Sequence, residues 1–209
     1  MPVFRSGRGS APPWGEMEEF EIIDLQAGEE KTCRGRSPRQ HFIGVGGRAR
    51  VRWQATSVAV DAGDQLEVTV RTDVRLMAET LAQVFRAAGR WEHICSAGIF
   101  TVKPGAPPQG DTPHDYPKTT TFDNHYHDCD EYWVMLEGRA TVATEGKLFE
   151  VGPGDAVATG CGWHHDVLRC HSEDGIRGIW FEGTLEGRKR VGHLWEPKHG
   201  RAVPMVDRV

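Results

Sequence analysis

The sequence is short of paired cysteines, of long apolar runs and of positive charge. Its five cysteines are scattered and include no Cys-x-x-Cys pair, a pattern typical of free thiols in a reducing compartment and not of a disulfide framework. No stretch approaches the roughly 18 uninterrupted apolar residues that a membrane-spanning helix needs. The net charge of −5 disfavours nucleic acid as the main partner, because neutralising phosphates requires a basic surface. We therefore expect a cytoplasmic protein without a membrane or nucleic-acid partner.

The remaining composition is that of an ordinary folded protein. Hydrophobic residues make up 38% and charged residues 26% of the 209 positions, which is enough for one large or two small domains. Residues 1–18 are rich in glycine and proline and carry no apolar core behind their charges. We expect a flexible N-terminal arm there and no secretory signal.

A repeat runs through the chain. Shifting the sequence by 91 positions (138 − 47) aligns Gly47-Arg48-Ala49 with Gly138-Arg139-Ala140 without a gap. The same shift aligns Gly63-Asp64 with Gly154-Asp155, and the apolar pattern between these identities also agrees. The coincidence of glycines, Gly-Asp pairs and apolar positions indicates an internal duplication.

Most of each copy has the pattern of short strands. Runs such as YWVML, RATVAT and KLFEV are β-branched or aromatic and are separated by glycine or proline. Residues 73–90 differ, because Met77, Leu81, Val84 and Phe85 recur at helical spacing behind Asp73 as an N-cap. The sequence therefore predicts an all-β chain with a first domain at 19–72, a linking helix at 73–90 and a second domain at 91–209.

Three histidines and one glutamate in the second copy form a candidate metal site. His125 and His127 are two apart, so on a strand both imidazoles point to one face. Glu131 opens an apolar strand, where an unpaired carboxylate would be costly to bury. His165 follows a Gly-Cys-Gly turn and can arrive from a neighbouring strand. Cys129, which lies between these ligands, has no evident base partner and is expected to be a structural thiol.

Three imidazoles and one carboxylate suit a first-row divalent ion such as Fe, Mn, Co, Ni or Zn. Four protein ligands leave one or two coordination positions for water or substrate when the ion is five- or six-coordinate. Such an open arrangement is typical of a catalytic site, and we expect one divalent transition metal per chain.

The ligand spacing resembles the cupin superfamily. The pattern His125-x-His127-x₃-Glu131-x₆-Gly138 is similar to the first cupin motif from its first histidine onward, although Thr119 replaces the glycine that precedes it. The second motif is similar at Gly154, Gly162 and His165, and its spacing selects His165 over His164. Gly160 and Arg169 replace its proline and its final asparagine, and the ligand positions are unchanged.

The resemblance implies a bicupin, a double jelly-roll-like β-barrel with two such barrels in one chain. Subtracting 91 from the four ligand positions gives Arg34, Arg36, Gln40 and Val74. A guanidinium cannot donate to a metal, so we expect the N-terminal barrel to be metal-free and to serve as a packing or dimerisation partner. A homodimer is therefore expected.

Further site residues follow from strand alternation. Trp133 and Met135 share the phase of Glu131, and Val167 shares that of His165, so these three either line a substrate pocket or fill the core. Arg169 also shares the phase of His165, so it is either an inward clamp for a carboxylate or phosphate or an exposed residue at the end of the strand. Glu182 is a candidate general base if its side of the strand at 176–183 faces inward. The polar residues of the Pro-rich stretch at 103–118, expected to be a loop over the barrel mouth, are further candidates: His114, Asp115, Tyr116 and Lys118.

Three functions are compatible with such a site. The first is an enzyme acting on a small oxygenated metabolite, namely a sugar, sugar acid or hydroxy acid, by isomerase or lyase chemistry. The second is an iron-dependent dioxygenase. The third is a module that binds a small ligand without catalysis, because a fold does not fix a function.

Overall fold

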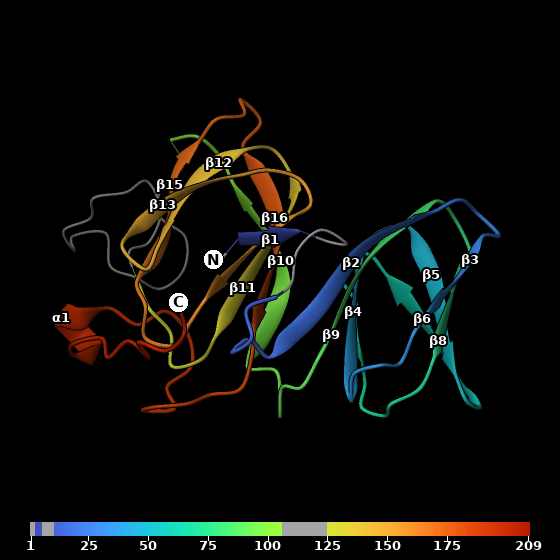
Figure 1. Ribbon diagram of the computed structural model, residues 1–209. Coiled ribbons are helices and arrows are strands. Elements are labelled where there is room, and N and C mark those ends of the chain that lie inside the picture. The colour runs from blue at the N-terminus through green and yellow to red at the C-terminus, as the bar shows by residue number, and fades with distance from the viewer. Residues whose placement is uncertain (1–2, 6–10, 106–124) are drawn as a thin grey trace. The chain divides into compact units, whose positions relative to one another are not determined.

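The computed structural model describes residues 3–5, 11–105 and 125–209. These residues form sixteen strands and a single four-residue helix, α1 (Glu196–His199), so the all-β prediction is confirmed (Figure 1). The chain divides into two compact units, of which unit 1 comprises residues 1–15 and 92–209 and unit 2 comprises residues 16–91.

Unit 1 contains two antiparallel sheets that enclose an apolar core of residues such as Met135, Val142 and Ile176. The first sheet has five strands in the order β1 (Val3–Arg5), β14 (Asp155–Thr159), β11 (Glu131–Glu137), β16 (Ile176–Glu182) and β10 (Ser96–Val102). The second has three strands in the order β13 (Lys147–Val151), β12 (Ala140–Thr144) and β15 (His165–Cys170).

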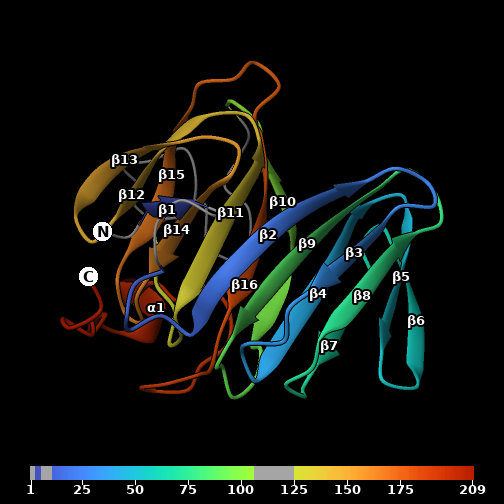
Figure 2. The same ribbon diagram turned by 45° about the vertical axis from the view of Figure 1, so that its right-hand side comes forward.

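Unit 2 also contains two sheets around a core of its own, which includes Phe42, Val51 and Leu76 (Figure 2). One has the order β2 (Met17–Leu25), β9 (Ala82–Gly89), β4 (Arg39–Gly46) and β7 (Gln65–Val68). The other has the order β3 (Glu30–Cys33), β8 (Val74–Ala78), β5 (Arg48–Trp53) and β6 (Thr56–Asp61).

The two units repeat one strand arrangement. The order β9-β4-β7 in unit 2 corresponds to β16-β11-β14 in unit 1, and β8-β5-β6 corresponds to β15-β12-β13. Gly47 and Gly138, 91 positions apart, both have positive φ, at 65° and 77°, where a side chain would be strained. Within the described residues each unit consists of separate sheets and not of one closed barrel.

The predicted helix at residues 73–90 is wrong, because this segment forms β8 and β9. Its apolar residues belong to two strands, and combining them across the turn produced a false helical period. Leu81, which the helical face would bury, is 66% exposed, whereas Val74 and Leu76 alternate inward along β8. Asp73 caps no helix; its carboxylate instead accepts hydrogen bonds from the backbone N–H of Gly35 and from Arg34.

The predicted N-terminal arm is also partly ordered. Val3–Arg5 pairs antiparallel with β14, Phe4 is buried, and Arg5 forms an ion pair with Asp155. Residues 1–2 and 6–10 lie outside the described part of the chain, as do His114, Asp115, Tyr116 and Lys118 of the predicted loop.

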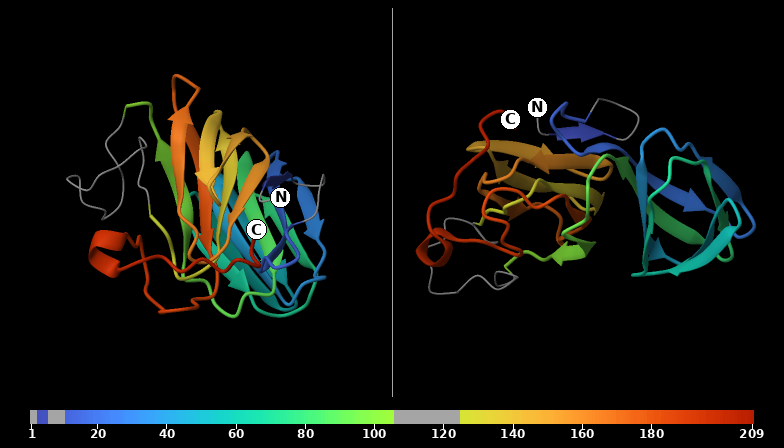
Figure 3. Two further views of the ribbon diagram at one scale, coloured as in Figure 1. Left: turned by 60° about the vertical axis from the view of Figure 1, so that its left-hand side comes forward. Right: turned by 90° about the horizontal axis from the view of Figure 1, so that it is seen from below.

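After β16 the chain continues across one end of the sheets of unit 1, drawn in red in Figure 3. We call residues 183–209 the C-terminal segment. It pairs with the strand ends through a bridge between Tyr126 and Leu194, and Tyr126 packs in a small cluster with Leu194 and Ala202. Among the described residues, no helix is long and apolar enough to cross a membrane.

Candidate metal centre

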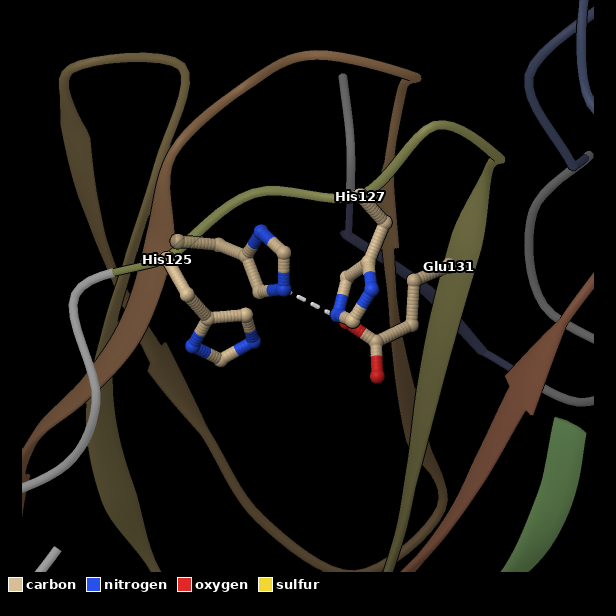
Figure 4. A group of neighbouring side chains, drawn as sticks. His125, His127 and Glu131 are labelled. Atoms are coloured by element: carbon tan, nitrogen blue, oxygen red, sulfur yellow. Dashed lines mark ion pairs between the residues drawn. The ribbon is translucent and has the colours of Figure 1, made fainter. Parts of the chain in front are cut away.

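The four predicted ligands come together at the end of unit 1 that the C-terminal segment covers. His125 bridges to His165, the first residue of β15, while His127 precedes a bend and Glu131 opens β11. All four side chains are buried, and one ligand atom from each lies within 4.8 Å of the others. Figure 4 shows the side chains of His125, His127 and Glu131 pointing toward one another.

Two backbone carbonyls fix how the imidazoles present their nitrogens. The Nδ1 of His127 lies 3.0 Å from the carbonyl oxygen of Gly192, and the Nδ1 of His165 lies 3.0 Å from that of Trp163. A carbonyl only accepts, so each Nδ1 carries the proton and each Nε2 keeps its lone pair. Both rings are therefore held in the tautomer that binds a metal through Nε2.

These lone pairs face a carboxylate. The Oε2 of Glu131 lies 2.5 Å from Nε2 of His165 and 3.5 Å from Nε2 of His127. None of these three buried atoms has a hydrogen-bond partner. Burial lowers the pKa of His127 to about 4, so this imidazole is neutral at pH 7. Burial raises the pKa of Glu131, but the two imidazoles outweigh it and hold that pKa near 2, so the carboxylate is charged.

A cation between the two Nε2 atoms and the carboxylate would stabilise this arrangement, since a lone pair and a carboxylate oxygen are both acceptors. The donor set of three imidazoles and one carboxylate fits a first-row divalent ion, which would bind at the four buried ligand atoms. The residues present therefore fit the metal that the sequence predicted.

The sequence did not reveal two contributions from the C-terminal segment. Gly192 supplies the carbonyl that orients His127, and the ring of His193 stacks on that of His125 with centroids 3.9 Å apart. His193 is also 5.4 Å from the ring of His127. Neither residue lies in a periodic run, and a backbone carbonyl leaves no trace in a residue pattern. The one visible signal was His193 itself, the single histidine of the run from Gly192 to Trp195.

Glu182 is buried and lies directly across from Glu131 in the pairing of β11 and β16, so both side chains leave the sheet on one face. Burial raises the pKa of Glu182 to about 9, and the charge of Glu131 adds to this rise. Its carboxylate, however, approaches the Nδ1 edge of His127, at 4.0 Å, and not the Nε2 edge. Glu182 therefore lies behind a ligand, a position that does not suit the predicted general base.

The predicted inward clamp at Arg169 is wrong. The pairing of β12 with β15 aligns Thr141 with Arg169 and Val142 with Val167, so Leu168 is an extra residue in a bulge. The bulge reverses the alternation, and the side chain of Arg169 is exposed.

The three predicted pocket residues all belong to the apolar core of unit 1. Met135 and Val167 are fully enclosed, whereas Trp133 reaches the metal centre, with its ring 5.3 Å from that of His165. Trp133 is therefore the one of the three that can form a wall of the site, and the other two fill the core.

Comparison with known proteins agrees with this architecture. Residues 98–182 match the family model described as "Cupin domain". The uncharacterized protein y4oW of Sinorhizobium fredii (strain NBRC 101917 / NGR234) is 39% identical over 213 residues, spanning 100% of this chain and 97% of its own length.

Solved structures are similar at the level of the fold. A variant of the oxalate decarboxylase OxdC of Bacillus subtilis has a TM-score of 0.61 at 9% identity and covers 93% of this chain and 79% of its own. The oxalate decarboxylase of Lactobacillus farciminis, in a formate complex, has a TM-score of 0.60 at 10% identity, with coverage of 93% and 88%. AerE of Microcystis aeruginosa has a TM-score of 0.57 at 8% identity, with coverage of 78% and 86%.

Proposed function

Because the chain belongs to the cupin superfamily, we propose that it is a metal-dependent cupin enzyme that acts on a small oxygenated metabolite. The substrate class is a sugar, a sugar acid or a hydroxy acid, and the reaction is of the isomerase or lyase type. One observation carries the proposal: the buried Nε2 atoms of His127 and His165 are turned, without hydrogen-bond partners, toward the carboxylate of Glu131.

The donor set admits Fe, Mn, Co, Ni or Zn. Manganese is the ion to test first, since Mn(II) centers are described for the oxalate decarboxylase of Bacillus subtilis, a structure with a TM-score of 0.57 and 10% identity to this chain. An ion bound here would polarise a substrate oxygen and lower the pKa of a substrate hydroxyl.

We further propose that the two units are two cupin copies, of which only unit 1 holds metal. The positions equivalent to the ligands are occupied by Arg34, Arg36, Gln40 and Val74. The equivalent of Glu131, Gln40, is already engaged on both ends of its amide, with Oε1 accepting from Arg86 at 2.8 Å and Nε2 donating to the carbonyl of Thr72 at 2.9 Å. The guanidinium of Arg86 therefore lies beside Gln40, the equivalent of the ligand Glu131. Its positive charge disfavours a metal cation at that position.

We assign proton transfer to His193 in place of Glu182. The ring of His193 lies over His125 on the side of the C-terminal segment, whereas Glu182 approaches the Nδ1 edge of His127. An imidazole is suited to this role because it exchanges protons near neutral pH. Trp133 supplies an apolar wall next to His165, against which the face of a sugar ring or a carbon chain can pack.

The test of the metal centre is elemental analysis of protein purified with each candidate ion. His127→Ala and His165→Ala should lose the ion of this site, whereas Arg34→Ala and His164→Ala should keep it. His164 is a matched control, because it is the neighbour of His165 but its ring contacts Tyr126. Retention of the ion by both ligand variants would overturn the assignment.

The test of the reaction is oxygen uptake and turnover measured on protein purified with and without air. Turnover of a hydroxy acid or sugar without oxygen uptake supports the proposal, and His193→Gln should then abolish turnover while keeping the metal. Iron with substrate-dependent oxygen uptake would select a dioxygenase instead. Bound metal without turnover of any such substrate would select a non-catalytic binding module.

A further inference from the structure

A second cluster of metal-binding side chains lies behind the histidine site. Cys95 immediately precedes β10, Cys129 lies in the bend between His127 and β11, and Glu182 ends β16. The two sulfur atoms and a carboxylate oxygen of Glu182 all lie within 4.8 Å of one another. None of the three belongs to the histidine-rich ligand set.

Backbone pairing on both sides of β16 holds this cluster in place. The N–H of Cys95 donates to the carbonyl of Glu182 at 3.0 Å, and the next residue, Ser96, pairs with Glu182 in the sheet. On its other side Glu182 pairs with Glu131, which follows Cys129 by two residues. The two thiols therefore reach Glu182 from the two strands that flank β16.

Among the described residues, no lysine or arginine forms an ion pair with the carboxyl group of Glu182. The side chain of Glu182 is 7% exposed, and its Oε2 has no hydrogen-bond partner. The nearest basic nitrogen is Nδ1 of His127, 4.0 Å away, and that atom already donates to Gly192. The thiol of Cys95 is hydrogen-bonded to this carboxyl group, and the second thiol lies beside it. A cation could replace the protons of such a buried group and bind all three side chains.

We propose that Cys95, Cys129 and Glu182 form a second cation site, for a thiophilic dication of the Zn²⁺ class. Two thiolates and one carboxylate are ligands that zinc takes, with Zn–S bonds of about 2.3 Å, and their present separations require only small movements to reach a tetrahedron. Cys129 is buried but Cys95 is only half-buried, so the fourth position faces a route to solvent. This site is additional to the one ion that the sequence predicted.

A disulfide between the two cysteines is the competing interpretation. It would use both sulfur atoms but would leave the buried carboxylate of Glu182 without a partner. The cation site accounts for all three side chains, and for this reason we favour it.

The experiment is a Co²⁺ titration of the full-length chain, stripped of metal and kept reduced under anaerobic conditions. We expect two equivalents per chain, one of which produces the thiolate-to-Co²⁺ charge-transfer absorption in the near ultraviolet. Cys95→Ser and Cys129→Ser should each lose that band and one equivalent. His165→Ala should lose the other equivalent and retain the band, which separates this site from the proposed histidine site.

Two further variants keep the test decisive. Cys161→Ser is the matched control, because Cys161 is a buried thiol of the same unit that belongs to no such cluster among the described residues, and it should bind two equivalents. Glu182→Gln should weaken the band-producing site and leave the other unchanged. If Cys129→Ser fails to fold, Cys95→Ser, at a half-buried position, carries the test. Absence of the band from the reduced wild-type chain would overturn the proposal, as would a Cys95–Cys129 disulfide that persists under reduction.

Discussion

The Nδ1–H of His127 donates to the backbone carbonyl of Gly192, 65 residues further along the chain (192 − 127), across a distance of 3.0 Å. This hydrogen bond makes the C-terminal segment part of the candidate metal centre, because it selects the tautomer that leaves Nε2 free to bind. The segment is tied to the same loop by Arg190, whose N–H and Nε both donate to Oδ2 of Asp128, at 2.9 and 3.2 Å.

Arg190→Ala should therefore weaken metal binding without touching a ligand. Loss of the guanidinium removes contacts to Asp128, to the hydroxyl of Tyr126 and to the carbonyl of His199, so the Gly192 carbonyl is held less firmly. Changes that release an outer partner of a metal-binding histidine cost about 10–100-fold in affinity, and we expect the lower end of that range. Competition with a chelator measures the change.

The control is Arg188→Ala. Arg188 donates only to the carbonyls of His199 and Arg201 within the C-terminal segment, and it does not reach the loop that bears His127. Equal losses of affinity in the two variants would show that any loosening of the segment matters, and that the link to Asp128 has no special role.

The sequence predicted which four side chains come together better than it predicted the strands around them. His125 and His127 lie in a short segment before the bend that leads into β11, and Glu131 is the first residue of that strand. Their closeness in the sequence was therefore enough to predict that these three side chains meet. Gly138 and Gly47 both have positive φ, a backbone conformation that favours glycine. Both copies therefore have glycine at this position, which made the repeat recognisable in the sequence.

The errors arose where neighbouring strands, and not the local pattern, decide the structure. The segment at 73–90 has a helical period only when β8 and β9 are read as one element. Arg169 lost its inward phase through a bulge at Leu168 that depends on the pairing with β12. The position of Glu182 behind His127 depends on three strands meeting, and no single-strand pattern contains that information.

Gly138→Ala should destabilise unit 1 far more than Gly146→Ala. Both glycines have positive φ, at 77° and 67°, so each variant pays about 1 kcal/mol for the left-handed backbone. At Gly138 an added Cβ would also lie 2.2 Å from the carbonyl oxygen of Gly175, whereas at Gly146 it would meet nothing within 4 Å. Urea unfolding should show the difference, and equal free energies of unfolding would contradict the close approach of the two turns.

Arg86→Met should destabilise unit 2 by about 3 kcal/mol, the lower end of the cost of breaking a buried charged network. Arg86 is 1% exposed and donates to Gln40, to the carbonyl of Arg34 and to Glu21. We take the lower end because its carboxylate partners are partly exposed. Chemical denaturation measures the loss.

The matched change is Arg90→Met, four residues further along the chain (90 − 86). Arg90 is exposed and pairs with Glu18 at 3.1 Å, so its loss should cost at most about 1 kcal/mol. If the two variants were equally stable, the hydrogen bonds of Arg86 would not be what stabilises unit 2.

His41 should make the stability of unit 2 depend on pH. Its side chain is buried on β4, and burial lowers its pKa below the ordinary 6.5, although a hydrogen bond to Gln65 and the charge of Glu67 partly oppose the shift. Below pH 6.5 the unfolded chain therefore binds a proton that the folded chain does not. The free energy of unfolding has its full value above the pKa of the unfolded chain. As the pH falls from there toward the lower pKa of the folded chain, it decreases by at most about 1.4 kcal/mol per pH unit.

His41→Gln, which keeps a polar group but cannot be protonated, should show a flatter decline between pH 6.5 and 5 in parallel thermal or urea unfolding. The difference between the wild-type and variant profiles isolates His41, because the histidines of the candidate metal centre contribute equally to both. Identical profiles would mean that His41 is protonated in the folded chain as readily as in the unfolded one.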